Sequence, residues 1–520
     1  MPKLVIDNRE VEVAAGATIL DAARKLGIGI PTLCHLDGCT PSTSCMVCVV
    51  KLKNLGRVVP SCGTRAEDGM QIESETDEIR DARRAALELL LSDHPGDCLG
   101  PCQLVCPAHM DIPRMLRQIA AGHPADAAAT ARDALVLPAT LGRICPAPCE
   151  KGCRRAQHDV GLAIRLCHRH VADAELASGV RLPTCKPATG KRVALIGAGP
   201  AGLAAAWHLL GEGHACTVFD AHPEPGGMLR YSIPAETLPR DVLDAEIAAI
   251  ARLGAEFRMG MRIGRDIHLA DLQKEFDAVL VASGAPKDGH AATISPEPSP
   301  PPIEVDRRTW QTSVRGLFAG GEVVHKHRMA VRAVADGAAA ARSVSLYLAG
   351  LPITEPQRPF STRLYMTTHE EMARLVAGAS AAMRIDPTGG EAAGFTPDEA
   401  RREAPRCLHC DCRKADVCRL RQVSAALGAS PSRYHGTRRP FEQDLRHARI
   451  VYEPGKCIVC GLCLQVAERA GEPLGLALLG RGFNVRVGAP LADSMADGLR
   501  ISAAECVRAC PTGALAFKDE

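Results

Sequence analysis

The sequence lacks any apolar run close to the roughly 20 residues that a membrane-spanning helix needs. Its start, MPKLVIDNREVEVAAG, carries acids and alternating apolar positions and lacks the basic-then-apolar order of a signal peptide. It also lacks a charge imbalance, because its formal net charge of +2 indicates neither a nucleic-acid nor a membrane-surface partner. These absences predict a soluble, cytoplasmic chain without membrane insertion.

Cysteine, by contrast, is abundant, with 23 in 520 residues. In a reducing compartment disulfides are rare, and clustered cysteines are more often metal ligands or catalytic. The cysteines concentrate within 34–62, 98–106, 145–167, 407–418 and 457–510, and none lies between Cys216 and Cys407. This distribution predicts metal-bearing ends around a metal-free middle.

The first group has a spacing that suits a [2Fe–2S] cluster with four thiolates, namely Cys34, Cys45, Cys48 and Cys62. Zinc is the alternative, although a loop this long between ligands is unusual for it. The segments PTLCH and VPSCGT resemble the plant-type ferredoxin-like module that opens the large iron–sulfur subunit of respiratory complex I. The same module occurs in hydrogenases and NAD-linked formate dehydrogenases. The resemblance implies a β-grasp fold, in which Cys39 has no ligand position.

The next groups, HPGDCLGPCQLVCPAHMDIP and GRICPAPCEKGC, resemble the helical N-terminal domain of the glutamate synthase small subunit and of dihydropyrimidine dehydrogenase. In those proteins two [4Fe–4S] clusters have interleaved ligands. The resemblance implies one cluster on Cys98, Cys102 and Cys153, and a second on Cys106, Cys145 and Cys149.

Each of these sets needs a fourth ligand. For the first cluster the family's leading cysteine falls near His94, and histidine is a known iron ligand in Rieske centres. His94 could equally be an ordinary loop residue before proline. For the second cluster the family has Gln or Glu at a position that Cys167 occupies here, which implies that Cys167 is the ligand.

The middle of the chain begins with RVALIGAGPAGLAAAWHLLGEGHACTVFDA, an apolar strand followed by a glycine turn, a helix and a second strand. Gly197 permits the tight turn, Gly199 lets the backbone approach a pyrophosphate, and Gly202 allows close packing of helix and strand. Asp220 follows at the distance of an acid that binds ribose hydroxyls. The pattern predicts a dinucleotide-binding α/β unit.

Two further segments, HPEPGGMLRYSIP and VRGLFAGGEVV, resemble the FAD-contacting parts of the glutamate synthase small subunit family and imply FAD as the dinucleotide. Glu322 stands where that family usually has Asp, so it is either an FAD contact or a solvated turn acid. The residues implied at the FAD site are Gly197, Gly199, Pro200, Ala201, Gly202, Asp220, Gly227, Met228, Leu229, Arg230, Ile233, Gly284, Gly321, Glu322 and Ala330.

The chain departs from that family between these segments. The family inserts a second dinucleotide-binding domain there, whereas only about 18 residues separate Ala285 from Ile303, including the proline-rich connector SPEPSPPP at 295–302. A βαβ unit needs about 30 residues. We therefore expect that the NAD(P)H domain is missing and that this chain does not bind a nicotinamide by itself.

Cysteine returns near the end of the chain. Cys407, Cys410, Cys412 and Cys418 lie within twelve residues and predict a further [4Fe–4S] cluster, with zinc as the alternative. Cys457, Cys460, Cys463 and Cys510 predict another, in a block that resembles the four-iron segment of the complex I large subunit. Cys506 is left over, and Cys216 is expected to be an ordinary buried thiol in a strand.

The expected architecture is a multidomain α/β and α+β protein. Its predicted parts are a β-grasp [2Fe–2S] domain (1–79), a helical domain with two [4Fe–4S] clusters (80–186), a Rossmann-like FAD domain (187–354), a linker with a four-cysteine motif (355–425) and a ferredoxin-like [4Fe–4S] domain (426–520). The cofactor set is thus one FAD, one [2Fe–2S] and about four [4Fe–4S] clusters.

No nucleophile or general-base constellation for a substrate is evident. The main functional hypothesis is an electron-transfer subunit of a larger oxidoreductase, with a molybdopterin dehydrogenase such as formate dehydrogenase, or an NADH-oxidising flavoprotein, as the partner subunit. The alternative is a self-contained FAD/iron–sulfur oxidoreductase acting on a small substrate or NAD(P)H. A flavin that bifurcates electron pairs is a third hypothesis.

Overall fold

The computed structural model describes residues 1–285, 303–325, 329–355, 359–364, 367–434, 436–492 and 494–518. The predicted proline-rich connector at 295–302 lies outside these residues. The chain divides into two compact units. Unit 1 comprises Met1–Gly100, Pro359–Gly378 and His409–Glu520, and unit 2 comprises Pro101–Arg358 and Ala379–Leu408. The five predicted domain ranges stay a prediction.

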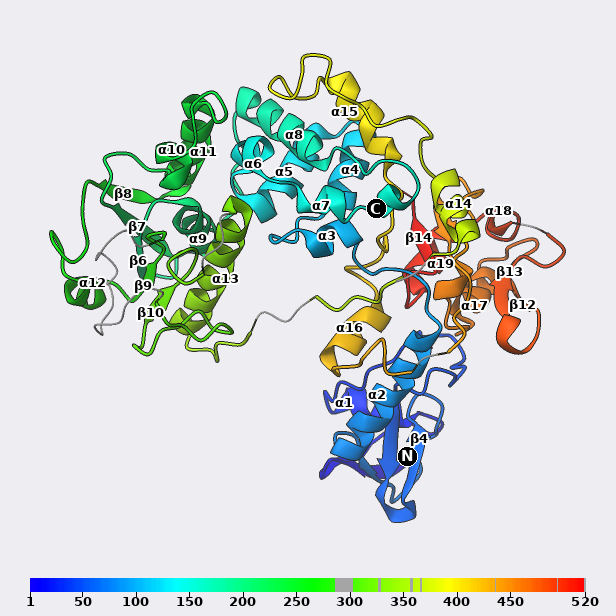
Figure 1. Ribbon diagram of the computed structural model, residues 1–520. Coiled ribbons are helices and arrows are strands. Elements are labelled where there is room, and N and C mark those ends of the chain that lie inside the picture. The colour runs from blue at the N-terminus through cyan, green and yellow to red at the C-terminus, as the bar shows by residue number, and fades with distance from the viewer. Residues whose placement is uncertain are drawn as a thin grey trace. The chain divides into compact units, whose positions relative to one another are not determined.

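Unit 1 begins with a five-stranded mixed sheet in the order β2-β1-β5-β3-β4 (blue in Figure 1). The helix α1 (Ile19–Lys25) starts at a capping box in which Thr18 and Asp21 bond each other's backbone N–H groups. Its apolar face packs on the sheet, giving a core that contains Leu4, Ile6 and Ile72. The strands and the second helix are β1 (Lys3–Ile6), β2 (Arg9–Glu12), β3 (Val49–Leu52), β4 (Arg57–Pro60), β5 (Gln71–Glu73) and α2 (Asp77–Ser92).

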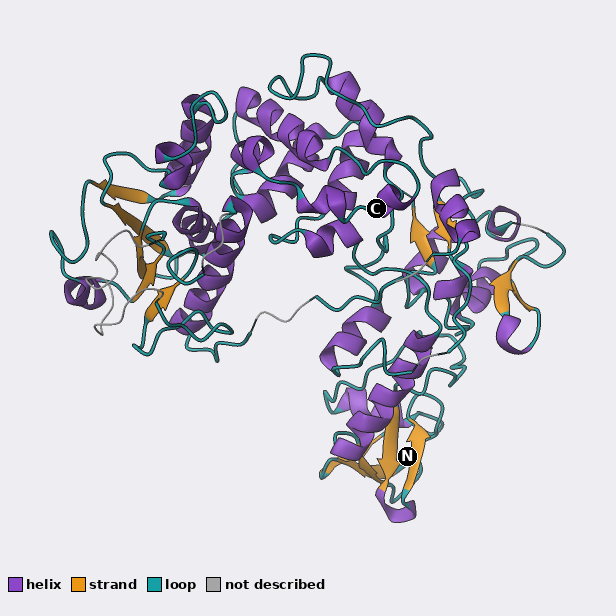
Figure 2. Ribbon diagram, viewed as in Figure 1, coloured by secondary structure: helices purple, strands orange, loops and turns teal. Residues whose placement is uncertain are grey.

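The rest of unit 1 is built around one antiparallel strand pair. β11 (Ile450–Tyr452) pairs with β14 (Leu515–Phe517), with Tyr452 opposite Leu515. β12 (Ala477–Leu479) pairs with β13 (Arg486–Gly488), and Figure 2 shows these short strands among helices and loops. The helices of this part are α14 (His369–Ala377), α16 (Arg419–Ala426), α17 (Leu462–Arg469), α18 (Met495–Gly498) and α19 (Ala503–Ala509).

Unit 2 opens with a helical bundle. Proline occupies the first turn of most of its helices, where no intrahelical N–H bond is lost. The helices are α3 (Pro101–Val105), α4 (Ile112–Ala120), α5 (Pro124–Leu135), α6 (Pro138–Ile144), α7 (Pro148–Lys151), α8 (Ile164–Ser178) and, from the later segment, α15 (Pro397–Glu403).

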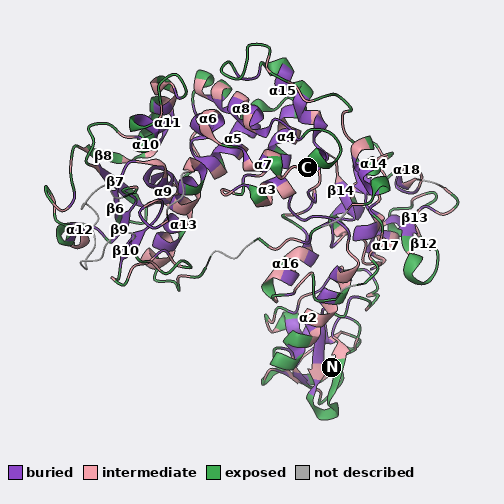
Figure 3. Ribbon diagram, in the orientation of Figure 1, coloured by how far each residue is buried: buried purple, intermediate pink, exposed green. Residues whose placement is uncertain are grey.

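A parallel sheet in the order β10-β9-β6-β7-β8 follows within unit 2. Its central strands are apolar along almost their whole length, because helices cover both faces of a parallel sheet (Figure 3). The strands are β6 (Arg192–Ile196), β7 (Ala215–Asp220), β8 (Glu256–Met259), β9 (Ala278–Val281) and β10 (Leu317–Ala319). The helices are α9 (Pro200–Gly211), α10 (Met228–Tyr231), α11 (Arg240–Leu253), α12 (Leu269–Glu275) and α13 (Ala330–Leu348). No helix in the described part of the chain is both long and apolar enough to cross a bilayer.

The helices α9 and α13 approach so closely that one glycine is required between them. A Cβ atom on Gly337 of α13 would overlap the backbone carbonyl of Ala201 in α9. A backbone carbonyl cannot rotate away as a flexible side chain can, so the contact is rigid. The close packing fixes α13 against the helix that follows the glycine turn.

We expect Gly337→Ala to lower the free energy of unfolding of unit 2 by about 1–3 kcal/mol, because the added methyl group overpacks this contact. Gly211→Ala, at the end of α9, is the matched control, since a Cβ atom there meets nothing within 4 Å. Because alanine favours a helix more than glycine does, Gly211→Ala should leave the free energy of unfolding unchanged or raise it by up to about 1 kcal/mol. Denaturant unfolding of both variants checks this, and equal stabilities would contradict it.

Candidate metal centres and nucleotide site

The four N-terminal cysteines of the predicted [2Fe–2S] site meet at one end of the β3–β4 hairpin. Val49 pairs with Pro60, so Cys48 and Cys62 flank the same end of that hairpin. Ser61 strengthens the link, since its backbone N–H and its hydroxyl both donate to the Cys48 carbonyl, at 3.2 and 2.7 Å. All four thiols are buried. The register of one hairpin thus returns Cys62 to the loop that carries the other three.

These thiols also contact each other. Hydrogen bonding with Cys45 and then Cys62 lowers the pKa of Cys34, and hydrogen bonding with Cys62 lowers the pKa of Cys48 to about 6. The same contacts, together with burial, raise the pKa values of Cys45 and Cys62. Four converging sulfur atoms that are shielded from water fit the thiolate set that a [2Fe–2S] cluster requires.

Cys457, Cys460, Cys463 and Cys510 line one small cavity of unit 1, with Tyr452, Val487 and Leu515 among its apolar walls. Burial, followed by the charges of Cys510 and Cys457, raises the pKa of Cys460 to about 12. The structure therefore brings together all four residues of the predicted C-terminal cluster, around a cavity that suits an inorganic group with thiolate ligands.

The N-terminal and C-terminal thiol groups are neighbours within unit 1. The charge of Cys34 is also among the causes that raise the pKa of Cys460. Cys34, Cys45 and Cys460 belong to one buried core, which also includes Cys418. The two candidate cluster sites therefore adjoin each other through this core.

In unit 2, Cys106, Cys145 and Cys149 form a third group. Burial first, and then the charges of Cys106 and Cys145, raise the pKa of Cys149. The predicted fourth ligand, Cys167, is fully buried in α8. After burial, the charges that raise its pKa come from Glu403, Glu150 and Cys407, and Arg384 opposes them. Its role as a ligand of this group stays a prediction.

The two remaining predicted sets include residues from both units. Cys98 and His94 belong to unit 1, whereas Cys102 and Cys153 belong to unit 2. Cys407 belongs to unit 2, whereas Cys410, Cys412 and Cys418 belong to unit 1. These two ligand sets stay predictions. Among the described residues, no group of three or more His, Cys, Asp or Glu side chains is arranged to hold a single metal ion.

His94 is half-buried, and its imidazole is held neutral. Burial first, and then the charges of Lys456 and Arg439, lower its pKa to about 3. A neutral imidazole is the form that binds iron. His94 also borders a cavity together with Cys457, Arg439 and Phe483.

Sequence reasoning missed two buried lysines of unit 1. Lys456 pairs with Glu453 at 2.5 Å, and Lys414 donates to the carbonyls of Val507 and Cys510, each at 2.7 Å. Burial lowers the pKa of Lys456, but the negative charges of Cys412, Glu453 and Cys98 outweigh it and raise the pKa above its ordinary value. Single lysines follow no motif, so only the fold reveals them.

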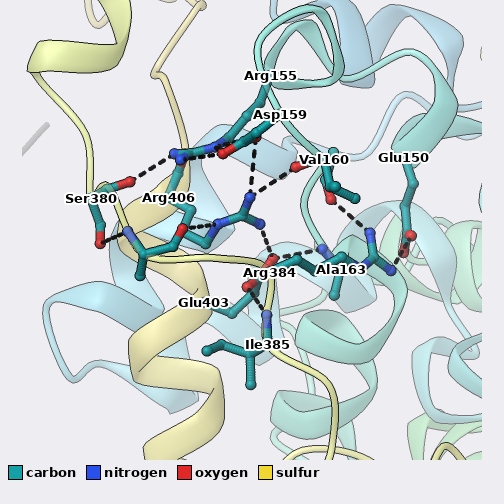
Figure 4. Close-up of polar contacts among 12 residues, drawn as sticks. Glu150, Arg155, Asp159, Val160, Ala163, Ser380, Arg384, Ile385, Glu403 and Arg406 are labelled. Carbon is teal, nitrogen blue, oxygen red and sulfur yellow. Dashed lines mark hydrogen bonds and ion pairs between the residues drawn. The ribbon is translucent and has the colours of Figure 1, made fainter.

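Sequence reasoning also missed an ionic network that joins the segment 379–408 to the helical bundle of unit 2 (Figure 4). Glu403 accepts hydrogen bonds from the backbone N–H groups of Ala163 and Ile385, both at 2.9 Å, and pairs with Arg406 at 2.9 Å. Both ionic side chains are fully buried. Arg406 precedes Cys407 in the chain and Ala163 precedes α8, so the network fixes the positions of Cys407 and Cys167.

The same network extends outward at both ends. Arg155 pairs with Asp159 at 2.8 Å and donates to the carbonyls of Ser380 and Arg406, at 2.9 and 2.6 Å. On the other side, Arg384 pairs with Glu150 at 2.9 Å. Each buried charge therefore has an opposite charge and neutral partners.

The predicted dinucleotide residues gather at the carboxyl edge of the parallel sheet. Gly197, Asp220, Gly284 and Gly321 come at or directly after the carboxyl ends of β6, β7, β9 and β10. Ligands of open α/β sheets bind at this edge. The structure therefore brings the first glycine turn and the later Gly321 turn to one place.

The glycines at this edge leave open space for a ligand. Gly197 has φ +114°, and a Cβ atom there would overlap the Ala282 carbonyl. Gly199 has no atom nearer than Gly227 Cα, 3.9 Å from the position of a Cβ. The helix α9 begins at Pro200, so its free N–H groups point to this opening, and a pyrophosphate fits there.

The carboxylate of Asp220 already takes part in three hydrogen bonds within the protein. Its carboxylate accepts hydrogen bonds from the backbone N–H groups of Ala198 at 2.7 Å and His222 at 2.9 Å, and it bonds His222 Nδ1 at 2.8 Å. The His222 ring stacks on Tyr231, with 4.4 Å between the ring centroids. Asp220 therefore shapes the glycine turn, and its contact with a ribose stays a prediction.

The other predicted flavin residues surround this edge. Gly227 caps α10, which contains Met228, Leu229 and Arg230, and Arg230 forms an ion pair with Asp244. Gly321 has φ +82° and contacts the Ala201 side of α9, Glu322 is half-buried, and Ala330 begins α13. Pro200 and Gly202 lie in α9, and Ile233 packs against the main core of unit 2.

Three protein-family models match successive parts of the chain. Residues 3–77 match a 2Fe-2S iron-sulfur cluster binding domain, residues 92–180 match dihydropyrimidine dehydrogenase domain II with a 4Fe-4S cluster, and residues 195–252 match an NAD(P)-binding Rossmann-like domain. The chain joins iron–sulfur domains to a dinucleotide-binding Rossmann-like domain. This combination is that of an oxidoreductase, and it confirms the predicted fold classes.

Curated relatives point the same way. The chain is 42% identical over 206 residues to the NADP(+)-dependent formate dehydrogenase subunit beta of Moorella thermoacetica, covering 35% of this chain and 29% of the relative. It is 41% identical over 188 residues to the NADPH-Fe(3+) oxidoreductase subunit beta of Geobacter sulfurreducens, covering 36% and 28%. It is 37% identical over 186 residues to the NAD-dependent dihydropyrimidine dehydrogenase subunit PreT of Salmonella typhimurium, covering 35% and 45%. The matches thus span less than half the length of each relative.

We expect Arg406→Met to destabilise unit 2 by about 3–5 kcal/mol, because it leaves Glu403 as a buried charge without its cationic partner. Arg265→Met is the control, since Arg265 is exposed and pairs only with its neighbour Asp266. That variant should stay within about 0.5 kcal/mol of the wild type. Denaturant unfolding distinguishes the two, and equal stabilities would show that the network contributes little.

Cys62→Ala should remove about two irons per chain, because it deletes one of the four converging thiols of the N-terminal site. Cys39→Ala is the matched control, since Cys39 is buried nearby without a ligand position. Iron and acid-labile sulfide analysis of the purified variants measures this. Loss of iron in the Cys39 variant but not the Cys62 variant would refute the assignment.

Proposed function

We propose that this chain is an electron-transfer subunit that relays electrons between FAD and several iron–sulfur clusters within a larger oxidoreductase. The observation that carries the proposal is that Cys34 and Cys45 of the N-terminal thiol group share one apolar core with Cys460 of the C-terminal group, with Cys34 close enough to act on Cys460. Neighbouring clusters within a dry interior are what a relay requires. The relatives' names, which describe subunits of formate dehydrogenase and of other oxidoreductases, support this reading.

FAD is our choice for the dinucleotide at the carboxyl edge of the parallel sheet. It would be held by the glycine turn at Gly197–Gly202, the N-terminus of α9 and the turn at Gly321. FAD exchanges either one or two electrons, so it can connect one-electron clusters to a two-electron donor. The chain's own contribution is to position the dinucleotide with backbone groups.

The proposed partner is a second redox subunit, of the molybdopterin dehydrogenase or NADH-oxidising flavoprotein type. The sequence offers no evident nucleophile or base constellation, so in this proposal the two-electron substrate reacts on that partner. The formate dehydrogenase subunit among the relatives favours a molybdopterin-dependent formate dehydrogenase as the assembly.

A second candidate has one specific observation in its favour. The matched Rossmann-like domain is described as NAD(P)-binding, so a nicotinamide could act on this chain directly. The separation of about 18 residues between Ala285 and Ile303 argues against a separate nicotinamide domain, which needs about 30 residues.

An anaerobic titration decides between the two candidates. We expect NADH and NADPH to leave the visible absorption of the purified chain unchanged, and dithionite then to bleach it fully. Rapid bleaching by either nucleotide would establish the self-contained oxidoreductase. A purified chain that contains neither flavin nor iron would refute both candidates.

A further inference from the structure

Three thiols of unit 1 lie together although their positions in the chain assign them to different clusters. Cys98 belongs by resemblance to a cluster with Cys102 and Cys153, and Cys412 and Cys418 belong by spacing to the four-cysteine motif. The fold of unit 1 links Cys98 to that motif. The Cys412 backbone N–H donates to the Cys98 carbonyl at 3.2 Å, across more than 300 residues of chain.

A single turn, Pro511–Gly513, contacts two of the four cysteines of the later motif, Cys412 and Cys418. Cys418 Sγ lies 3.8 Å from the Pro511 carbonyl oxygen, and the Leu420 N–H donates to the same oxygen at 3.1 Å. A Cβ atom on Gly513 would overlap Cys412 Sγ. Cys412 and Cys418 are therefore both held against this turn, and the glycine makes room for a sulfur atom.

Hydrogen bonds also hold the segment that carries Cys98 in place. Cys98 Sγ lies 3.3 Å from the Thr362 hydroxyl, and that hydroxyl donates to the Gly96 carbonyl at 2.8 Å. The Leu364 N–H donates to Asp97 at 2.9 Å. All three cysteines are buried. These contacts fix the position of the Cys98 thiol away from solvent.

A buried cation lies within the same group. A Cβ atom on Gly96 would lie 2.8 Å from Lys456 Cε, and one on Gly513 would lie 3.7 Å from Lys456 Cδ. Lys456 therefore passes between the Cys98 segment and the Cys412 turn. A buried ammonium is costly unless opposite charge surrounds it. Glu453 supplies one charge, and an anionic group with thiolate ligands would supply more.

We propose that Cys98, Cys412 and Cys418 are ligands of one [4Fe–4S] cluster, which the Pro511–Gly513 turn and Lys456 enclose. The proposal rests on the proposed function, because it takes the chain to be an iron–sulfur electron carrier. It joins ligands from segments that sequence spacing separates, and it commits to three of the four ligands. A four-iron cluster separates its thiolates by the width of the cubane, so the sulfur atoms need not converge on a single ion.

This site would be the third cluster of unit 1. Cys418 belongs to the same buried core as Cys34, Cys45 and Cys460. The Pro511–Gly513 turn directly follows Cys510, a predicted ligand of the C-terminal cluster. The new cluster would therefore lie next to the C-terminal cluster and extend the relay within unit 1.

Iron counting in double variants tests the grouping. Cys98→Ala and Cys412→Ala should each remove about four irons, and the double variant should also remove only about four, because both residues serve one cluster. The control is the pair Cys149→Ala and Cys412→Ala. Cys149 lies with Cys106 and Cys145 in unit 2, so those losses should add to about eight irons.

A loss of about eight irons in the Cys98/Cys412 double variant would overturn the proposal, because it would place the two residues in different clusters. If the alanine variants fail to fold, the serine variants, which keep an oxygen donor, replace them. Cys98→Ser and Cys412→Ser should then change the same electron paramagnetic resonance signal of the dithionite-reduced protein. Changes in two different signals would overturn the grouping.

The wild-type protein separates this proposal from the proposed function. A wild-type chain with its full iron and flavin content, combined with additive losses, refutes only the grouping of Cys98 with Cys412. A wild-type chain that binds no cluster and no flavin refutes the proposed function itself.

Discussion

Antiparallel strand pairing is the constraint on which the candidate cluster sites of unit 1 depend. The four cysteines of each candidate cluster are not all in one loop. The chain must therefore fold back to bring the last cysteine to the other three. The pairing of Val49 with Pro60 returns Cys62 to the N-terminal loop. The pairing of Tyr452 with Leu515 does the same for Cys510, which precedes β14, and Cys457, which follows β11. A shift of one residue in either register would reverse which face each neighbouring side chain meets.

Buried charge is the second requirement, and the two units meet it in different ways. Unit 1 places the lysines Lys414 and Lys456 directly beside its thiol groups, with carbonyl oxygens or one carboxylate as partners. Unit 2 instead connects Glu403, Arg406 and their neighbours in a network of alternating charges around Cys407 and Cys167. The network of unit 2 compensates its own charges, whereas Lys414 has carbonyl oxygens as partners and Lys456 has the single carboxylate of Glu453. The two lysines therefore lie where an anionic cofactor is expected.

The sequence predicted the local structure well where one short segment decides it. The strands Lys3–Ile6 and Val49–Leu52 and the glycine turn after β6 are confirmed, because alternation and the glycine spacing act within a few residues. The convergence of Cys34, Cys45, Cys48 and Cys62 was likewise predictable from a known spacing. The proximity of Cys98 to Cys412 was not, since more than 300 residues separate them and no local pattern encodes their contact. The ionic network around Glu403 could not be predicted from the sequence either, because its members are common charged residues without a motif.

At the carboxyl edge of the parallel sheet, we expect dinucleotide binding to depend more on backbone groups than on side chains. A carboxylate has about four acceptor positions, and Asp220 uses three bonds on Ala198 and His222. Few acceptor positions of this carboxylate therefore remain for the two ribose hydroxyls. The open space beside Gly199 and the N-terminus of α9 are unaffected by these bonds. Binding of the pyrophosphate should therefore contribute more to dinucleotide affinity here than recognition of the ribose, and Asp220 acts mainly by holding the glycine turn in the shape that the pyrophosphate needs.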